Sequence, residues 1–313
     1  MKKIYFVISV LAAFALSSCN SNDDILNSSS NGAEITISSD PDCCSAEEAL
    51  AVQNFLHTVK PIDGLSLEIG GLYRIDVYSR TGTLHTGYND LYFVGTKLST
   101  GNFIKFVDIT NLRPLMLMTK MNMQHSTPVS GEVTFLDTKL AAVKHGWVSF
   151  VMSSSDGGSW TLAYDAEVLK ETGTLEAADI SVSALSDGQN WLKSFKVCDD
   201  TYYLSLVNPT DWKTGTNKIT AYVSKKNTPV TTPYVLAAEQ FTLDIDPRMP
   251  DMGNHSSPGN EPLILQADGS YQGTINLTMT GLWRIFLTVK DAQGNVVAGG
   301  DIDTSTLYWD VTI

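Results

Sequence analysis

Long apolar runs, positive charge and histidine are all scarce in this sequence. Beyond residue 16, no stretch offers the roughly 20 consecutive apolar residues that a membrane-spanning helix needs. Lys and Arg together number 21 against 34 Asp and Glu, which gives a formal charge of −13. Such a charge repels phosphate backbones and argues against a protein that binds nucleic acid.

The common signatures of enzymes are missing as well. The sequence has no H-E-x-x-H, no G-x-S-x-G, no phosphate-binding loop and no dinucleotide fingerprint. The stretch "GSYQG" (269–273) resembles a nucleophile elbow only superficially. We therefore predict that the protein is not an enzyme.

Cysteine is limited to four residues, namely Cys19, Cys43, Cys44 and Cys198. Adjacent cysteines rarely bond to each other because the ring that they would close is strained. One member of the Cys43–Cys44 pair could instead bond to Cys198 in an oxidising compartment. The alternative is that the adjacent pair holds a soft metal ion.

The first residues have the pattern of an export signal. Lys2 and Lys3 precede a short apolar run, and "LSSC" (16–19) ends that run with small residues before a cysteine. This resembles a bacterial lipoprotein signal, with residues 1–18 removed and lipid attached to Cys19; the alternative is an ordinary secretion signal. Residues 19–44 are then a flexible tether. The resemblance implies a chain anchored by lipid to the bacterial outer membrane, on its periplasmic or cell-surface face.

Alternating and β-branched stretches dominate the remainder of the chain. Ser45 and Glu48 form a capping-box pattern, so we expect a short helix and connector over 45–64. After residue 65 come short strand-like segments separated by Gly, Asn and Asp turns, such as "GLYRIDVYS", "GWVSFVMSS" and "WRIFLTVKD". They predict an all-β chain with two tandem immunoglobulin-like β-sandwiches, over residues 65–180 and 190–313.

The sequences of the two predicted sandwiches are similar enough to indicate an internal repeat. The residues that recur in the same order are Asn89 and Asn217, His125 and His255, Met152 and Met279, and Trp160 and Trp283. Each copy also carries a Met/His segment before a proline, "MNMQHSTP" at 121–128 and "MPDMGNHSSP" at 249–258. An internal repeat of this kind predicts that the two copies share one architecture.

Methionine beside histidine in a polar loop is typical of a site for a soft ion. If 115–125 is one extended strand, Met121, Met123 and His125 share a face, and Met116 and Met118 point to the other. Any single methionine could equally fill a core. Thioether sulfur and imidazole suit Cu(I), however, and thioethers do not form disulfides in an oxidising compartment.

The second copy also carries a family pattern. It consists of a Met/His/Pro loop, a G-x-Y turn and a strand ending M-x-G-x-W, made by Met249, Met252, His255 and Pro258, by Gly269 and Tyr271, and by Met279, Gly281 and Trp283. The pattern resembles the YtkA-like (FixH-related) β-sandwich domain family. The first copy departs from it, with "MSSSDGGSW" between Met152 and Trp160 and "KHGW" in place of G-x-Y. The resemblance spans most of residues 70–305 and implies an envelope lipoprotein linked to copper handling, with copper-handling envelope proteins as partners.

The pattern and the donor chemistry together predict Cu(I) ligands in each copy. The predicted ligands are Met121, Met123, His125 and Met152 in the first copy and Met249, Met252, His255 and Met279 in the second; His85 and His145 are further candidates. Whether they form two sites or one shared site stays open. The competing hypotheses are a non-catalytic surface-binding or scaffold lipoprotein, in which the Met/His loops are structural, and a passive stalk.

Overall fold

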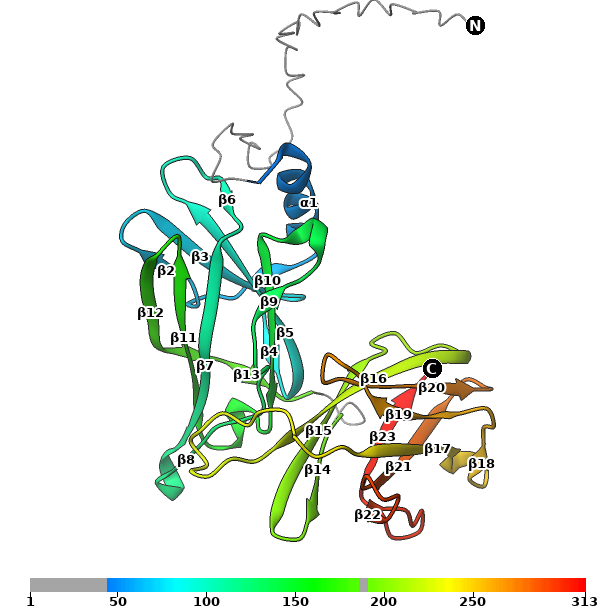
Figure 1. Ribbon diagram of the computed structural model, residues 1–313. Helices are drawn as coiled ribbons and strands as arrows, with labels where there is room; N and C mark the ends of the chain where they lie inside the picture. Colours follow the sequence, from blue (N-terminus) through cyan, green and yellow to red (C-terminus); the bar gives the residue numbers. More distant parts are fainter. Residues whose placement is uncertain (1–43, 186–190) are drawn as a thin grey trace, which may run out of the picture. The chain divides into compact units, whose positions relative to one another are not determined.

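The computed structural model describes residues 44–185 and 191–313. The predicted signal, the lipidation site at Cys19, residue Cys43 and all of the predicted tether before residue 44 lie outside the described residues. The described chain is built almost entirely from strands preceded by a short helix, so the predicted fold class is confirmed (Figure 1). No helix in either described range is long and apolar enough to cross a bilayer.

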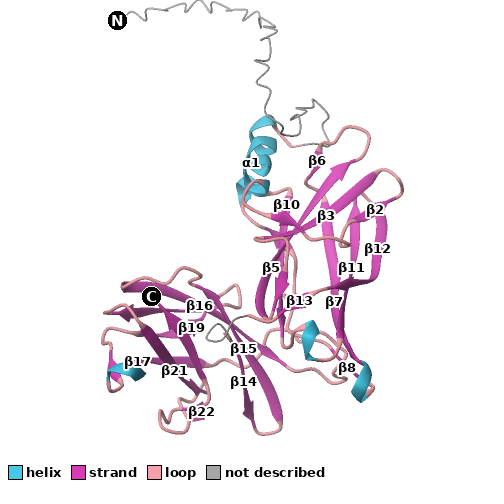
Figure 2. Cartoon of the chain, turned by 180° about the vertical axis from the view of Figure 1, so that it is seen from behind, coloured by secondary structure: helices cyan, strands magenta, loops and turns pink. Residues whose placement is uncertain are grey.

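Helix α1 (Ala46–Leu56) begins at the predicted capping box. The Ser45 hydroxyl accepts a hydrogen bond from Glu48 N, and the Glu48 carboxylate accepts one from Ser45 N. Glu48 also pairs with Lys105, and Val52 packs against the neighbouring β-sheet. The helix therefore lies against the first sheet, beside β10, as Figure 2 shows.

The first sandwich consists of two main sheets and a short parallel pair. One sheet has the order β1 (Lys60–Pro61), β3 (Tyr73–Ser79), β5 (Gly87–Lys97), β10 (Val143–Phe150) and β9 (Thr134–Phe135), with β2 (Leu67–Ile69) on β3 and β6 (Phe103–Ile104) on β5. The other has the order β12 (Glu171–Ile180), β11 (Ser159–Val168), β7 (Val107–Met118) and β8 (Met123–His125). Strands β4 (Leu84–His85) and β13 (Val182–Ser183) pair in parallel. Short 3₁₀ turns are η1 (Thr119–Met121), η2 (Thr138–Leu140) and η3 (Ser154–Asp156).

A hydrophobic core lies between the two main sheets of the first sandwich. Ile75 and Phe93 come from one sheet, and Met116, Trp160 and Tyr164 come from the other. All five are almost fully buried. Because side chains alternate between the two faces of a strand, the residues between them point outward. The inner face of β7 is therefore set by Met116 and its neighbours at every second position.

The second sandwich forms one continuous hydrogen-bonded sheet. Its order is β14 (Leu192–Val197), β15 (Asp200–Asn208), β16 (Gly215–Lys225), β20 (Tyr271–Leu277), β19 (Glu261–Leu265), β17 (Thr242–Met249), β21 (Leu282–Lys290) and β22 (Val296–Gly299), with β18 (His255–Ser256) on β17 and β23 (Tyr308–Thr312) on β21. The turn η4 (Pro250–Met252) connects β17 to β18. Strand β19 pairs with both β20 and β17, which joins the two layers. A second core, with Trp283 and Trp309 at its centre, shares no residue with the first.

An asparagine clasp repeats in the two sandwiches. The Asn89 side-chain amide donates to the carbonyls of His85 and Gly87, and its oxygen accepts from His85 N. Asn217 makes the same three bonds to Lys213 and Gly215. The two asparagines, which align in the sequence repeat, therefore occupy equivalent places near the start of β5 and β16.

The domain boundaries proposed from the sequence remain a prediction.

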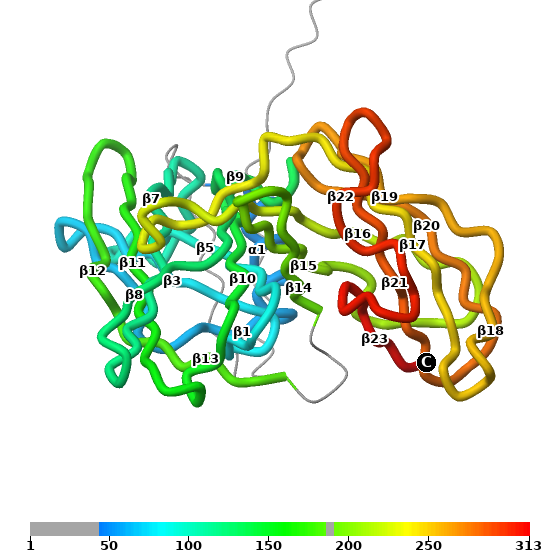
Figure 3. The backbone as a smooth tube through the Cα atoms, turned by 90° about the horizontal axis from the view of Figure 1, so that it is seen from below, coloured from blue at the N-terminus to red at the C-terminus, as the bar shows by residue number. Residues whose placement is uncertain are grey.

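The segment between β16 and β17 reaches the first sandwich. Ser126 N donates to the Val230 carbonyl over 2.7 Å, and Tyr234 exchanges main-chain hydrogen bonds with Thr127 and Val129. In Figure 3 this yellow segment runs past β8. The residues that follow His125 are thus held by main-chain bonds from a segment more than a hundred positions further along the chain.

Of the cysteines that the structure describes, Cys44 and Cys198 form no disulfide bond with each other. Cys44 is buried beside Phe103, with its sulfur 4.0 Å from the Phe103 carbonyl oxygen. Cys198 is exposed and free in the turn between β14 and β15. Cys43 lies outside the described residues.

Candidate metal centre

The Met/His segment of the first sandwich is a hairpin, and the prediction of one extended strand over 115–125 is wrong. Strand β7 ends at Met118, and η1 turns the chain through Asn122, whose φ of 48° lies in the left-handed region. Strand β8 then returns antiparallel to β7. A reversal changes which residues share a face. Met116 and Met118 therefore lie on the same face as His125, and the prediction that they point away from it is corrected.

The hairpin sets methionine opposite methionine and histidine opposite methionine. Met118 lies directly across from Met123, and Met116 lies directly across from His125. On the other side of β7, Met116 lies across from Trp160 of β11. Directly opposite residues of an antiparallel pair project from the same face of the sheet. His125, Met116 and Trp160 therefore form one row on the inner face.

The second sandwich repeats the histidine–methionine relationship. Strand β17 ends at Met249, the chain turns through η4 and Gly253, and His255 of β18 lies directly across from Met249. Gly253 has a φ of 64°, the left-handed conformation that suits glycine. This hairpin lacks the two residue pairs that the first has between the histidine and the turn, so it has no counterpart of the Met118–Met123 pair.

A glycine lies beneath the buried methionine in both sandwiches. A β-carbon at Gly158 would lie 2.6 Å from Met116 Cε, and one at Gly281 would lie 3.0 Å from Met249 Cε. Each glycine stands two residues before a buried tryptophan, Trp160 or Trp283. The absent side chain makes room for the end of the methionine.

The tryptophans fix a second methionine through its backbone. Trp160 Nε1 donates to the Met152 carbonyl over 3.0 Å, and Trp283 Nε1 donates to the Met279 carbonyl over 2.9 Å. Both methionines are partly buried and pack against the core of their own sandwich. The repeated pairs Met152–Met279 and Trp160–Trp283 are therefore structurally equivalent.

His125 carries a buried nitrogen without a partner. Its Nδ1 lies 2.9 Å from the Ser126 carbonyl oxygen, and its ring meets Trp160 edge to face with centroids 5.4 Å apart. A carbonyl oxygen can only accept, so in the neutral imidazole the proton resides on Nδ1 and Nε2 presents a lone pair. Nε2 is buried and makes no hydrogen bond to any described residue. Among the buried polar atoms of these residues that lack a partner, this imidazole nitrogen has the chemistry of a metal ligand.

His255 is placed differently because it is exposed on the surface of its hairpin. Its neighbour Arg248 donates to the carboxylate of Asp246 over 2.8 Å and to the Asn254 carbonyl over 3.4 Å. A fixed guanidinium next to the turn disfavours a bound cation. The first hairpin therefore offers the better-formed set of soft donors.

Residues 198–288 match the family model described as YtkA-like. This part of the chain is a YtkA-like domain. The matched residues include Met249, Met252, His255, Met279 and Trp283, on which the resemblance was based. The matched residues lie within the second sandwich.

No curated protein matches the chain. Among solved structures, the chain is similar to a Bacteroides ovatus protein described as SGBP-B of a mixed-linkage glucan utilization locus, in complex with a mixed-linkage heptasaccharide. The identity is 10%, the TM-score is 0.21, and the alignment covers 80% of this chain and 64% of that one. The chain thus spans less than two thirds of that protein's length. At this TM-score the similarity carries no argument about function.

The predicted ligands have unequal positions in the structure. Met121 and Met252 lie at the hairpin tips, each 55% exposed, and Met123 is 53% exposed. Met249 is buried next to the core of the YtkA-like domain. Sequence reasoning missed Met116 and Met118, which are buried at 0% and 6% exposure. The sequence signal for them was Asn122, a residue type that tolerates the left-handed conformation of a turn. A turn at Asn122 places Met116 opposite His125 and Met118 opposite Met123.

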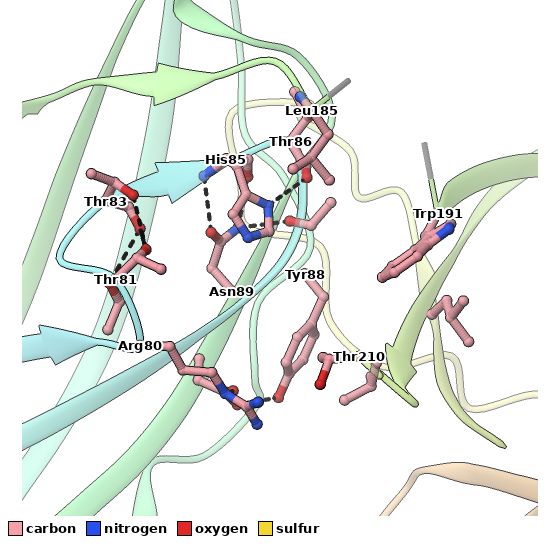
Figure 4. A pocket seen from close by; sticks show the side chains of 15 residues that line it. Arg80, Thr81, Thr83, His85, Thr86, Tyr88, Asn89, Leu185, Trp191 and Thr210 are labelled. Atoms are coloured by element: carbon pink, nitrogen blue, oxygen red, sulfur yellow. Dashed lines mark hydrogen bonds and ion pairs between the residues drawn. The ribbon is translucent and has the colours of Figure 1, made fainter. Parts of the chain in front are cut away.

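The further histidine candidates already have partners. His145 Nε2 lies 2.9 Å from Asp90 Oδ1, and His85 Nδ1 lies 2.9 Å from the Thr86 carbonyl oxygen. His85 and Tyr88 line a hollow of about 250 Å³, to which Trp191 also contributes (Figure 4). In the ranges 44–185 and 191–313, no three His, Cys, Asp or Glu side chains gather as a metal site would require. Methionine is therefore needed for any site built on His125.

Proposed function

We propose that the protein is a non-catalytic envelope lipoprotein that binds Cu(I) at the β7–β8 hairpin, for sequestration or delivery. The observation that carries this proposal is the buried, unpartnered Nε2 of His125, directly across the strand pair from the buried Met116. Imidazole nitrogen and thioether sulfur together select a soft ion such as Cu(I) over Mg²⁺, Ca²⁺ or Mn²⁺.

The residues present fit such an ion. The donors proposed for the first hairpin are His125 and Met116, with Met118 and Met123 as the next pair on the same face. Met152 is a further candidate, because its carbonyl is bonded to Trp160, whose ring contacts His125. The hydrogen bond from Nδ1 to Ser126 fixes the tautomer that leaves Nε2 available. In the YtkA-like domain the equivalent donors are Met249 and His255, supplemented by Met252 and Met279, and the exposure of His255 supports a weaker site there.

The test is a Cu(I) titration of the purified full chain against a coloured chelator, in reducing and anaerobic buffer. Cys19, Cys43 and Cys198 are replaced by serine and Cys44 by alanine, so that thiols do not contribute. We expect the parent to withhold about one equivalent of Cu(I) from the chelator, since binding needs only the neutral imidazole and thioethers. His125→Gln should lose this equivalent, and the matched variant His255→Gln should keep it.

Two outcomes would contradict the proposal. A parent that withholds no Cu(I) has no Met/His site. Equal behaviour of His125→Gln and the parent would mean that the buried Nε2 is not a ligand. Circular dichroism of each variant shows whether a loss of binding reflects a loss of the fold.

The alternative is a surface-binding lipoprotein whose Met/His hairpins are structural. The observation that favours it is the hollow of about 250 Å³, whose lining includes the aromatic rings of Tyr88 and Trp191 and the side chains of Thr81, Thr83 and Thr210 (Figure 4). Aromatic rings beside a few polar groups are typical of small-molecule sites. A Tyr88→Ala variant that loses a ligand but keeps Cu(I) binding would separate the two functions.

A further inference from the structure

The methionines of the first hairpin are buried in a graded order from its tip to its base. Met121 in the turn is 55% exposed, and Met123, the first residue of β8, is 53% exposed. Its partner Met118 is 6% exposed, and Met116 at the base is 0% exposed. Thioethers thus extend from solvent to the unpartnered nitrogen of His125.

Four members of this series, Met123, Met118, Met116 and His125, form two neighbouring pairs of the hairpin. Opposite residues of an antiparallel pair have Cα atoms about 4.5–5.5 Å apart and share a face. Met118 and Met123 are such a pair, and Met116 and His125 are the next pair on the same face, because they stand two positions further along each strand. The outward residue between them, Leu117, lies on the other face and is 38% exposed.

The hairpin of the YtkA-like domain provides an internal comparison. It keeps a methionine at the tip, Met252 with 55% exposure, and a methionine at the base, Met249 with 3% exposure. The intermediate pair is missing because β18 begins directly opposite Met249. Packing in the core therefore explains the base methionine in both hairpins and also Met118, but it does not explain the exposed Met123 opposite Met118.

We propose that Met121, Met123 and Met118 form a thioether ladder that passes Cu(I) between the hairpin tip and the buried site of Met116 and His125. This rests on the proposed function. In each step one Cu–S bond forms as another breaks, and the ion stays Cu(I), so no electron or proton is transferred. Met121 and Met123 are on this view transient ligands, and the sequence-based assignment of them as ligands of a resting site stays a prediction.

The test measures rates as well as affinity. Cu(I) transfer from the chelator to the full chain, and back, is followed by stopped-flow absorbance in the cysteine-replaced background. Met121→Leu and Met123→Leu keep side-chain volume and remove the sulfur. A residue on the path affects both directions equally, so we expect uptake and release each to slow about tenfold while affinity stays within about twofold. Leu117→Ala, on the outward face of the same hairpin, should change neither rate.

The other outcomes contradict either the ladder alone or the ladder together with the proposed function. Unchanged rates in a parent that binds Cu(I) would overturn the ladder and leave the proposed function intact. Faster release with weakened affinity would make Met123 a resting ligand and would also overturn the ladder. A parent that binds no Cu(I) would remove the proposed function and the ladder with it.

Discussion

Met116 of β7 lies directly across from His125 of β8, and Met249 of β17 lies directly across from His255 of β18. In each case the methionine is buried and its end passes over a glycine that precedes a tryptophan by two residues. The two hairpins differ in the histidine, which is half-buried in the first and exposed in the second. This difference predicts which sandwich binds a soft ion more tightly.

Replacement of Met116 by leucine should weaken Cu(I) binding without unfolding the protein. Leucine has a similar volume, so the loss of stability should stay below about 1.5 kcal/mol. Removal of an outer-sphere partner already costs about 10–100-fold in metal affinity, so loss of a direct ligand should cost at least as much. Chelator competition measures the affinity, with Met249→Leu as the control in the other hairpin. Equal affinities for Met116→Leu and the parent would exclude Met116 as a ligand.

Gly158→Ala should destabilise the first sandwich. The new β-carbon would lie 2.6 Å from Met116 Cε and 2.7 Å from the Leu117 carbonyl oxygen, so either the side chain or the backbone must shift. Overpacking of this kind costs about 1–3 kcal/mol. The control is Gly131→Ala, because a β-carbon at Gly131 meets no atom within 4 Å. Urea unfolding of both variants checks the prediction, which fails if the two midpoints are alike.

Trp160→Phe and Trp283→Phe should each weaken their own sandwich. Each change removes the donor to a partly buried methionine carbonyl, that of Met152 or Met279, so the cost should lie toward the lower end of the about 1–3 kcal/mol of an unsatisfied buried acceptor. Because the two cores share no residue, we expect each variant to lower a different step of a two-step unfolding curve. Calorimetry of both variants also tests the predicted domains at 65–180 and 190–313. A single step lowered equally by both changes would show one cooperative unit.

Asp165 should make the first sandwich sensitive to acid. Its hydrogen bond from Arg113, assisted by Asn111, lowers the pKa of this carboxyl from 3.8 to about 2. A pKa that is lower in the folded protein stabilises the fold above the ordinary carboxyl pKa. This stabilisation is lost as the pH falls from about 4 to about 2. Asp165→Asn should therefore flatten the decline of the urea midpoint in this window, and Arg113→Gln should raise the pKa of Asp165 as followed by NMR. A decline as steep in Asp165→Asn as in the parent would assign the acid sensitivity to other groups.

The strands were predictable because their side chains alternate and their turns carry glycine, asparagine or aspartate. The repeat also predicted real equivalences, as the identical clasps of Asn89 and Asn217 show. In the second hairpin, Pro250 and Gly253 indicate the turn between β17 and β18 in the sequence itself.

The geometry of the first hairpin was not predictable in the same way. Its turn contains neither glycine nor proline, and Asn122 takes the left-handed conformation instead. Without that turn, alternation along a single strand places Met116 away from His125. The hydrogen bond from Ser126 to Val230 was equally unpredictable from the sequence. Main-chain hydrogen bonds between distant segments leave no pattern in the side chains.

The graded burial of the methionines in the first hairpin also orders their susceptibility to oxidants. Oxidation to the sulfoxide follows exposure, so Met121 and Met123 would react before Met118, and Met116 would react last. A sulfoxide is polar and no longer a thioether donor. Oxidative damage would therefore reach the tip of the hairpin first and leave the sulfur beside His125 intact, and reduction of two exposed residues would restore the original surface.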